Sequence, residues 1–158
     1  KSLKYNPDQI IKMDGDGQHD PKYLISFINT QKKNPKSFLK GYRSLLLNNT
    51  PKIRFLGNYV ITFIIRFLTK NYNLKDVVNG YISIPKHILR ILDLKTLSND
   101  FFFEQDLIYQ ISVKKINIKE IKISTIYHDK ISSSLNEFKV ILPFILKYIK
   151  KFFLKFIN

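Results

Sequence analysis

Residues 9–21 read QIIKMDGDGQHDP. A short apolar run over residues 9–13 stops at two acids, each followed by glycine, which is typical of a strand that ends in a tight loop. This pattern places Asp14 and Asp16 on a loop directly after a strand. The glycine between them allows the backbone to come close to a ligand.

The acid loop has the chemistry of a cation site. Carboxylates from Asp14 and Asp16 and the amide oxygen of Gln18 are hard ligands of the kind that Mg²⁺ or Mn²⁺ prefers. An EF-hand is excluded, because its sixth and twelfth positions would be His19 and Ile25 instead of Gly and Glu. A plain polar turn before a helix remains the alternative, with His19 either a ligand or a hydrogen-bonding group.

Composition limits the classes of function. The 158 residues amount to one domain, and 44% hydrophobic residues supply a core, which excludes a disordered tail. The absence of Cys excludes disulfides, thiolate metal sites and Cys nucleophiles. The formal charge of +15 comes mostly from Lys. Either a bias in codon usage has enriched the solvated surface in Lys, or the surface binds an anionic partner. Nucleic acid is not the expected partner, since no nucleic-acid motif accompanies the charge.

Periodicity and turn residues predict the remaining elements. The expected helices cover residues 20–33, 51–68, 86–92 and 101–113, and the expected strands or extended segments cover residues 9–13, 38–42, 76–84 and 115–124. The long helix after Pro51 has its predicted core-facing side at Ile53, Leu56, Val60, Ile64, Phe67 and Leu68. Arg54 and Asn58 lie on its opposite side.

The last part of the chain predicts a basic amphipathic helix. Ser134 and Glu137 form a capping box. Beyond it, a helical wheel gathers five lysines in one arc and apolar residues in the other. Such a helix packs on the protein, lies in a membrane interface or binds a partner helix, and all three remain open. The longest uncharged run, residues 55–65, is about half of the ~20 residues that a membrane crossing needs.

Seven motifs in one order resemble glycosyltransferase family 2, particularly its branch of polyprenyl-phosphate sugar transferases such as dolichol-phosphate mannose synthase. They are the strand and Asp-x-Asp at 10–21, Gly41-Tyr42-Arg43, Arg54 with Asn58, the turn at 76–81, Phe103-Glu104-Gln105-Asp106-Leu107, Glu120-Ile121-Lys122-Ile123, and Tyr127 with Ser132-Ser133. The chain departs from the family pattern at Tyr42, Ile82 and Lys122.

The resemblance implies an α/β fold, namely a partial GT-A sheet, which is Rossmann-like, with flanking helices. Residues 1–135 would be the C-terminal portion of a GT-A domain, and residues 136–158 would be the amphipathic helix. The family's first strand and its nucleotide-binding loop should lie well before Asp14. We therefore expect a fragment that is inactive alone.

The resemblance also implies inverting transfer of a sugar from a nucleoside diphosphate sugar. Mg²⁺ or Mn²⁺ would be held by Asp14, Asp16 and Gln18, where it offsets the charge of the leaving diphosphate. Asp14 and Asp16, together with Arg43 and Arg54, would bind the nucleotide sugar. For either arginine, an exposed surface position without a role is the alternative.

Asp106 and Glu104 are the catalytic candidates, because the resemblance implies that this acidic segment lies beside the acceptor. A hydroxyl acceptor needs a general base, whereas a lipid phosphate needs only positioning. With a polyprenyl phosphate as acceptor, the basic helix would hold a cytoplasmic protein at the cytoplasmic face of the membrane. An acid pair stabilised by the helix dipole is the alternative for both residues. The alternative for the whole chain is a non-enzymatic, Lys-rich module that binds membrane or nucleic acid.

Overall fold

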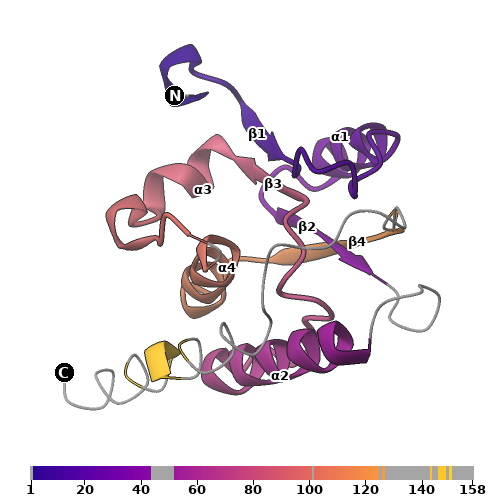
Figure 1. Ribbon diagram of the computed structural model, residues 1–158. Coiled ribbons are helices and arrows are strands. Elements are labelled where there is room, and N and C mark those ends of the chain that lie inside the picture. The colour runs from indigo at the N-terminus through magenta and orange to yellow at the C-terminus, as the bar shows by residue number, and fades with distance from the viewer. Residues whose placement is uncertain are drawn as a thin grey trace.

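The computed structural model describes residues 2–43, 52–100, 102–124 and 126, together with 143, 146–148 and 150. A four-stranded sheet with flanking helices forms the body of this part of the chain (Figure 1). Its elements are β1 (Gln9–Lys12), α1 (Tyr23–Lys33), β2 (Phe38–Arg43), α2 (Lys52–Thr69), β3 (Ile82–Pro85), α3 (Lys86–Ile91), α4 (Phe103–Val113) and β4 (Ile118–Ile123). The predicted α/β class is confirmed.

The sheet is mixed, with strand order β1-β3-β2-β4. β3 runs antiparallel to both of its neighbours, with Ile84 opposite Ile10 and Ser83 opposite Leu39. β2 and β4 are parallel, with Gly41 opposite Ile121. The strands β1, β2 and β4 therefore point the same way, and their carboxyl ends meet at one edge of the sheet. This arrangement is consistent with a partial Rossmann-like fold.

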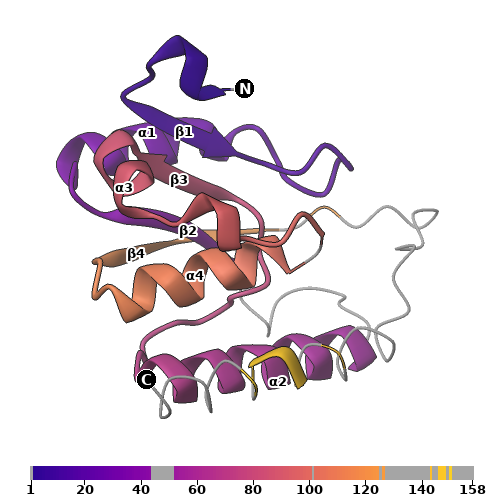
Figure 2. The ribbon, with the colours of Figure 1, turned by 90° about the vertical axis from the view of Figure 1, so that its left-hand side faces the viewer.

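Two clusters of buried apolar residues cover the two faces of the sheet. Alternate residues of β2 serve both clusters, because successive side chains of a strand point to opposite faces. Phe38 packs with residues of α2, α3 and α4, while Leu39 packs with Phe27 of α1. α1 and α2 consequently lie on opposite sides of the sheet (Figure 2).

The predicted elements match the observed ones within a few residues, except before β3. The segment over residues 76–84 was expected to be extended, but only Ile82–Pro85 forms a strand. Asp76 Oδ1 accepts from the Val78 N–H at 3.1 Å, and Asn79 Oδ1 accepts from the Tyr81 N–H at 2.9 Å. These bonds from a side chain to the backbone two residues on compete with a sheet ladder and produce turns.

The predicted packing face of α2 is wrong at two positions. Leu56 and Phe67 are each 58% exposed, whereas Ile61 and Ile65 are buried in the core. Ile64 is partly buried and packs against the core as predicted. Because α2 is apolar on nearly every side, periodicity alone did not identify the side that packs.

The predicted amphipathic helix over residues 136–158 lies mostly outside the described residues, and the division at residue 135 stays a prediction. Helical turns are described at Pro143, at 146–148 and at Lys150. Leu146 on the predicted apolar side is 60% exposed, and Tyr148 is fully buried. Among the helices described, none is long and apolar enough to cross a bilayer.

Candidate functional site

Lys12 joins the acid loop to the first turn of α4. Its Nζ lies 2.6 Å from Asp14 Oδ1 and 2.6 Å from Glu104 Oε1. Burial opposes the charged form of Lys12, but the hydrogen bonds and charges of the two carboxylates outweigh it and hold the pKa of Lys12 above its ordinary value. The side chain of Asp14 is 42% exposed and that of Glu104 is 14% exposed. One cation therefore lies between Asp14, whose carboxylate is half exposed, and Glu104, whose carboxylate is largely buried.

Gly80 packs against the same carboxylate. A Cβ atom at Gly80 would lie 2.5 Å from Asp14 Oδ2 and 3.0 Å from Lys12 Nζ, so a side chain would displace Asp14. Gly15, in contrast, has open space around it. The turn before β3 thus fixes one side of the acid loop.

His19 stabilises the acid loop through a hydrogen bond to its backbone. Its Nδ1 accepts the backbone N–H of Asp14 at 3.0 Å, and its ring lies 5.2 Å from the ring of Tyr81. Burial lowers the pKa of His19 against the opposing charges of Asp14 and Asp16, so the imidazole is neutral at neutral pH. With Nδ1 occupied by a backbone donor, the structure gives His19 the hydrogen-bonding role rather than that of a ligand through Nδ1.

Asp16 and Gln18 form the tip of the loop. Asp16 is exposed, and its Oδ1 accepts the backbone N–H of Gln18 at 2.9 Å. The second carboxylate oxygen of Asp16 is not used in that bond. The turn therefore presents Asp16 to solvent beside Asp14.

The donor set fits a hard divalent cation that is shared with a substrate. Within the described part of the chain, no three acidic or histidine side chains converge on one point. Mg²⁺ commonly binds through one or two carboxylates plus phosphate oxygens and water, so Asp14 and Asp16 suffice as protein ligands. Lys12 would compete with such a cation, because its ammonium already pairs with Asp14 at 2.6 Å.

A second charged pair lies at the end of β2. Arg43 donates through Nε to Asp76 Oδ2 at 2.8 Å and through Nη2 to Asp76 Oδ1 at 3.2 Å. Burial alone would raise the pKa of Asp76, but Arg43 outweighs it and lowers that pKa to about 2. This two-pronged pair ties the turn before β3 to β2, so Arg43 is held by a carboxylate rather than lying loose on the surface.

Lys40 is a buried cation in the middle of β2. Its side chain is fully buried and donates to the carbonyl oxygen of Asn79 at 2.7 Å. Burial lowers its pKa to about 8, against the opposing charge of Asp76. Lys40 fixes the same turn that Arg43 fixes.

The side chain of Arg54 lies outside the described residues, so its expected contact with nucleotide sugar stays a prediction. Four residues on, Asn58 lines a small cavity of about 90 Å³ together with Tyr59, Thr62 and Asp76. The first half of α2 therefore borders the pair formed by Asp76 and Arg43.

Asp106 is enclosed by its neighbours. Its carboxylate is fully buried and accepts from Ser98 Oγ at 2.6 Å, from Lys147 Nζ at 2.7 Å and from Tyr148 Oη at 2.7 Å. Burial, followed by the charge of Asp106, raises the pKa of Tyr148, so the phenol keeps its proton and donates it. Lys147 belongs to the predicted basic face of the last helix, yet it points inward here.

The structure gathers most of the predicted site at the carboxyl edge of β1 and β2. Asp14 contacts the turn at 76–81 beside Gly80, and Arg43 contacts it at Asp76. Glu104 is joined to Asp14 through Lys12, and Asp16 and Gln18 follow Asp14 on the acid loop. Asp106 is directed away, into the contact with 147–148. Lys12 and Lys40 were missed, and their only sequence signal was a lysine inside an apolar strand.

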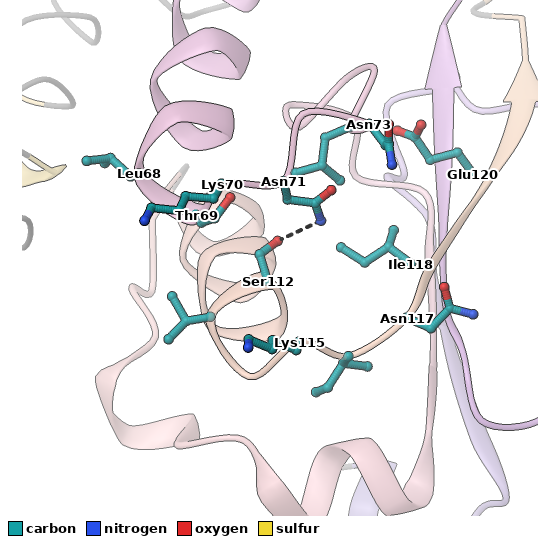
Figure 3. Close-up of a pocket in the computed structure, with 13 residues that line it drawn as sticks. Leu68, Thr69, Lys70, Asn71, Asn73, Ser112, Lys115, Asn117, Ile118 and Glu120 are labelled. Atoms are coloured by element: carbon teal, nitrogen blue, oxygen red, sulfur yellow. Dashed lines mark hydrogen bonds between the residues drawn. The ribbon is translucent and has the colours of Figure 1, made fainter.

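Another cavity lies at the other end of α4 (Figure 3). It measures about 490 Å³, and Asn71 and Ser112 lean toward each other across it at 3.4 Å. Asn117 and Ile118, at the start of β4, form a further wall. Asp14 and Asp16 follow β1 at the opposite edge of the sheet, so this cavity is not part of the candidate site.

Comparison with known proteins gives two similar sequences, and no family model matches the chain. A UDP-N-acetylglucosamine–dolichyl-phosphate N-acetylglucosaminyltransferase of Methanococcus voltae is 28% identical over 139 residues, which are 80% of this chain and 51% of that protein. An uncharacterized protein of Methanocaldococcus jannaschii is 27% identical over 157 residues, which are 94% of this chain and 63% of that protein. The chain thus spans between half and two thirds of these relatives, and the similarity is consistent with a glycosyltransferase.

Proposed function

We propose that this chain is part of an inverting glycosyltransferase that moves a sugar from a nucleoside diphosphate sugar to a lipid phosphate. The observation that carries the proposal is that the turn at 76–81 contacts both Asp14, which shares Lys12 with Glu104, and Arg43, which pairs with Asp76. The name of the Methanococcus voltae relative supports a lipid phosphate as the acceptor and a uridine diphosphate sugar as the first donor to test.

The donor diphosphate is assigned to the acid loop. Asp14, Asp16 and Gln18 would hold Mg²⁺ or Mn²⁺, which supplies positive charge to the departing diphosphate. In the reaction, an acceptor oxygen forms a bond to the anomeric carbon while the bond from that carbon to the diphosphate oxygen breaks, and the diphosphate leaves with the electron pair. Arg43 adds a guanidinium near this edge, and Arg54 remains a second candidate.

The acceptor side is assigned to Glu104 ahead of Asp106. Glu104 faces Lys12 and the acid loop, whereas Asp106 is buried under Lys147 and Tyr148. A phosphate acceptor is already an anion and needs no general base, so Glu104 would act by holding Lys12 and orienting the acceptor. Asp106 then serves the site indirectly, by fixing α4.

A lipid acceptor implies work at a membrane surface. We propose that the predicted basic helix over residues 136–158 contributes to a peripheral position on the cytoplasmic face. Lysines near a bilayer gain roughly 1 kcal/mol each from anionic lipids.

The test is nucleotide binding by the natural full-length protein. UDP and GDP are titrated with and without Mn²⁺ by calorimetry, on the wild type and on Asp16→Asn and Asp14→Asn. We expect one nucleotide to bind only with Mn²⁺, and each variant to weaken that binding at least roughly tenfold, since each removes a charged ligand. A folded protein that binds neither nucleotide would contradict the donor-site assignment and favour the non-enzymatic module.

A matched glycine pair sharpens this test. Gly80→Ala places a methyl group against Asp14, whereas Gly15→Ala, in the same acid loop, meets nothing within 4 Å. We expect Gly80→Ala to weaken the binding of Mn²⁺ without nucleotide, because it moves Asp14, and Gly15→Ala to leave the binding of Mn²⁺ alone within about twofold. Unchanged Mn²⁺ binding in Gly80→Ala would mean that the position of Asp14 does not matter.

A further inference from the structure

The cavity in Figure 3 lies where two helices end. α2 ends at Thr69 and α4 ends at Val113, and both residues line it. Its volume of about 490 Å³ is within the range of roughly 300–1,000 Å³ that is usual for small-molecule sites. We call it the amide cavity, because three asparagines line it: Asn71, Asn73 and Asn117.

The polar groups of the amide cavity can both donate and accept hydrogen bonds. An asparagine amide has two donor hydrogens and a carbonyl acceptor, and a serine hydroxyl can act in both ways. Asn71 points toward Ser112 (Figure 3), but the distance of 3.4 Å from Asn71 Nδ2 to Ser112 Oγ is long for a hydrogen bond. Asn73 is exposed beside them. These groups fit a ligand that carries several hydroxyls.

Apolar side chains line the same cavity. Leu74 belongs to the hydrophobic core, and the partly buried Ile116 and Ile118 pack against that core. A ligand in this cavity therefore meets C–H groups as well as amides. A ring polyol, which has hydroxyls at its edge and C–H groups on its faces, presents both kinds of surface.

The charges around the amide cavity favour a neutral ligand. Lys70 and Lys115 are exposed on its lining, and Glu120 is a partly buried acid there. The carboxyl ends of α2 and α4 add partial negative charge. A cationic ligand would meet the two ammonium groups, whereas an anionic ligand would meet Glu120 and the two helix ends. A neutral ligand avoids both repulsions.

Hydrogen bonds to neighbouring segments hold the lining in place. Glu120 Oε1 accepts the backbone N–H of Lys75 at 2.9 Å, and Asn117 Nδ2 donates to Ser37 Oγ at 2.9 Å. β4, which begins at Ile118, is paired with β2 along the sheet. A site whose walls are already fixed loses little conformational entropy when a ligand binds.

We propose that the amide cavity binds a neutral ring polyol, namely an uncharged monosaccharide or a cyclitol. The inference goes beyond the proposed function, because it uses neither the acid loop nor a nucleotide. It assigns a second ligand site to the end of the sheet at which β4 begins.

The experiment is a titration of the natural full-length protein by saturation-transfer difference NMR, without Mn²⁺ or nucleotide. Glucose and myo-inositol are the two neutral probes, and glucose 6-phosphate and putrescine are the charged ones. The test variant carries Asn71→Ala and Asn73→Ala. The matched control carries Asn29→Ala and Asn99→Ala, two asparagines that are exposed elsewhere. Circular dichroism verifies that each variant is folded, and Asn73→Ala alone is a milder test at an exposed position.

We expect at least one neutral probe to bind, with an affinity that falls at least roughly fivefold in the test variant and less than about twofold in the control, since a lost hydrogen bond costs about 1 kcal/mol. Binding of glucose alone would identify a sugar as the ligand, and binding of myo-inositol alone would identify a cyclitol. A wild type that binds neither probe would overturn the proposal, as would equal binding by the test variant and the wild type. Tighter binding of a charged probe through the same asparagines would also overturn it.

Nucleotide titration separates this proposal from the proposed function. We expect the Asn71→Ala and Asn73→Ala variant to bind Mn²⁺ and nucleotide as the wild type does, and Asp14→Asn to keep its polyol binding. Loss of polyol binding in Asp14→Asn would place the polyol at the acid loop and overturn the proposal. If polyol binding follows the asparagines while no nucleotide binds, the amide cavity stands and the donor-site assignment fails.

Discussion

Two carboxylates from the first turn of α4 have opposite environments. Glu104 belongs to the Lys12 cluster, which consists of Lys12, Asp14 and Glu104. One ammonium there pairs with two carboxylates, and Asp14 is half exposed to solvent. Asp106 is fully buried and receives hydrogen bonds from Ser98, Lys147 and Tyr148. The cluster around Asp106 is complete, whereas the Lys12 cluster carries negative charge in excess of its single cation.

The difference separates stability from ligand binding. A buried carboxylate with all of its hydrogen bonds made has nothing left to offer a ligand, and it is costly to remove. The ion pair between Lys12 and Asp14 is half exposed, so it adds little stability and can exchange its partners. We therefore expect substitutions at Asp106 to affect unfolding, and substitutions in the Lys12 cluster to affect binding.

The largest effect is expected at Asp106. Asp106→Ala leaves Lys147, Ser98 and Tyr148 without their acceptor, which should lower the free energy of unfolding by about 3 kcal/mol. Urea unfolding followed by circular dichroism measures it. Glu104→Ala is the matched comparison, and we expect a loss of less than about 1 kcal/mol there. Similar losses for the two variants would break the contrast between the clusters.

The next effect concerns acid. Because the pKa of Asp76 is about 2 in the folded protein against 3.8 unperturbed, its ionised form stabilises the fold above pH 4, and that contribution is lost as the pH falls through 2. A shift of this size corresponds to about 2 kcal/mol. The free energy of unfolding is measured for the wild type and for Asp76→Asn between pH 7 and pH 2. The difference in this free energy between the two proteins should become smaller as the pH falls. A constant difference would mean that Arg43 does not act through the charge of Asp76.

Lys40 provides a smaller effect with the opposite pH dependence. Its pKa is about 8 in the folded protein against 10.5 unperturbed, so the unfolded chain binds more protons between these values and stability rises with pH. The expected gain is about 1 kcal/mol between pH 8 and pH 9. Lys40→Met should abolish this rise relative to the wild type. If the free energy of unfolding changed with pH in the same way in both proteins, burial would not lower the pKa of Lys40.

The smallest expected change in stability, and the most informative for binding, is at Lys12. Lys12→Met removes the cation that competes for Asp14, so Mn²⁺ alone should bind severalfold more tightly while stability changes by less than about 1 kcal/mol. Lys22→Met is the control, because Lys22 pairs with Asp20 at 2.7 Å away from the cluster. Unchanged Mn²⁺ binding in Lys12→Met would contradict the assignment of Asp14 as a ligand.

The sequence predicted the elements well and their orientation less well. Strands and helices were readable because apolar spacing and turn residues agree along most of the chain. The exception before β3 arose from Asp76 and Asn79, whose side chains hold turns that an apolar pattern does not reveal. For α2, a helix apolar on two sides has two equally good packing faces, and only contact with the sheet chooses between them.

The candidate site was predicted in part, for a related reason. The acid loop can be predicted from the sequence, because its Asp and Gly residues directly follow an apolar strand. Lys12 and Lys40 look like surface lysines, because nothing local shows that a carboxylate or a carbonyl will meet each ammonium. The inward direction of Asp106 depends on Lys147 and Tyr148, about forty positions later in the chain.

The strand order bears on how the chain acquires its fold. β1 pairs with residues 82–85, and β2 pairs along its whole length with residues 118–123. During synthesis, β1 and β2 are made before β3 and β4, so neither of these two strands can form its described pairing until its partner emerges. Folding rates fall as contacting residues lie farther apart in sequence, so we expect slow, late assembly in a single step that includes β4. Until that step, the apolar side chains of β1 and of α2 are exposed together, and a nearby membrane or chaperone would shelter the nascent chain from aggregation.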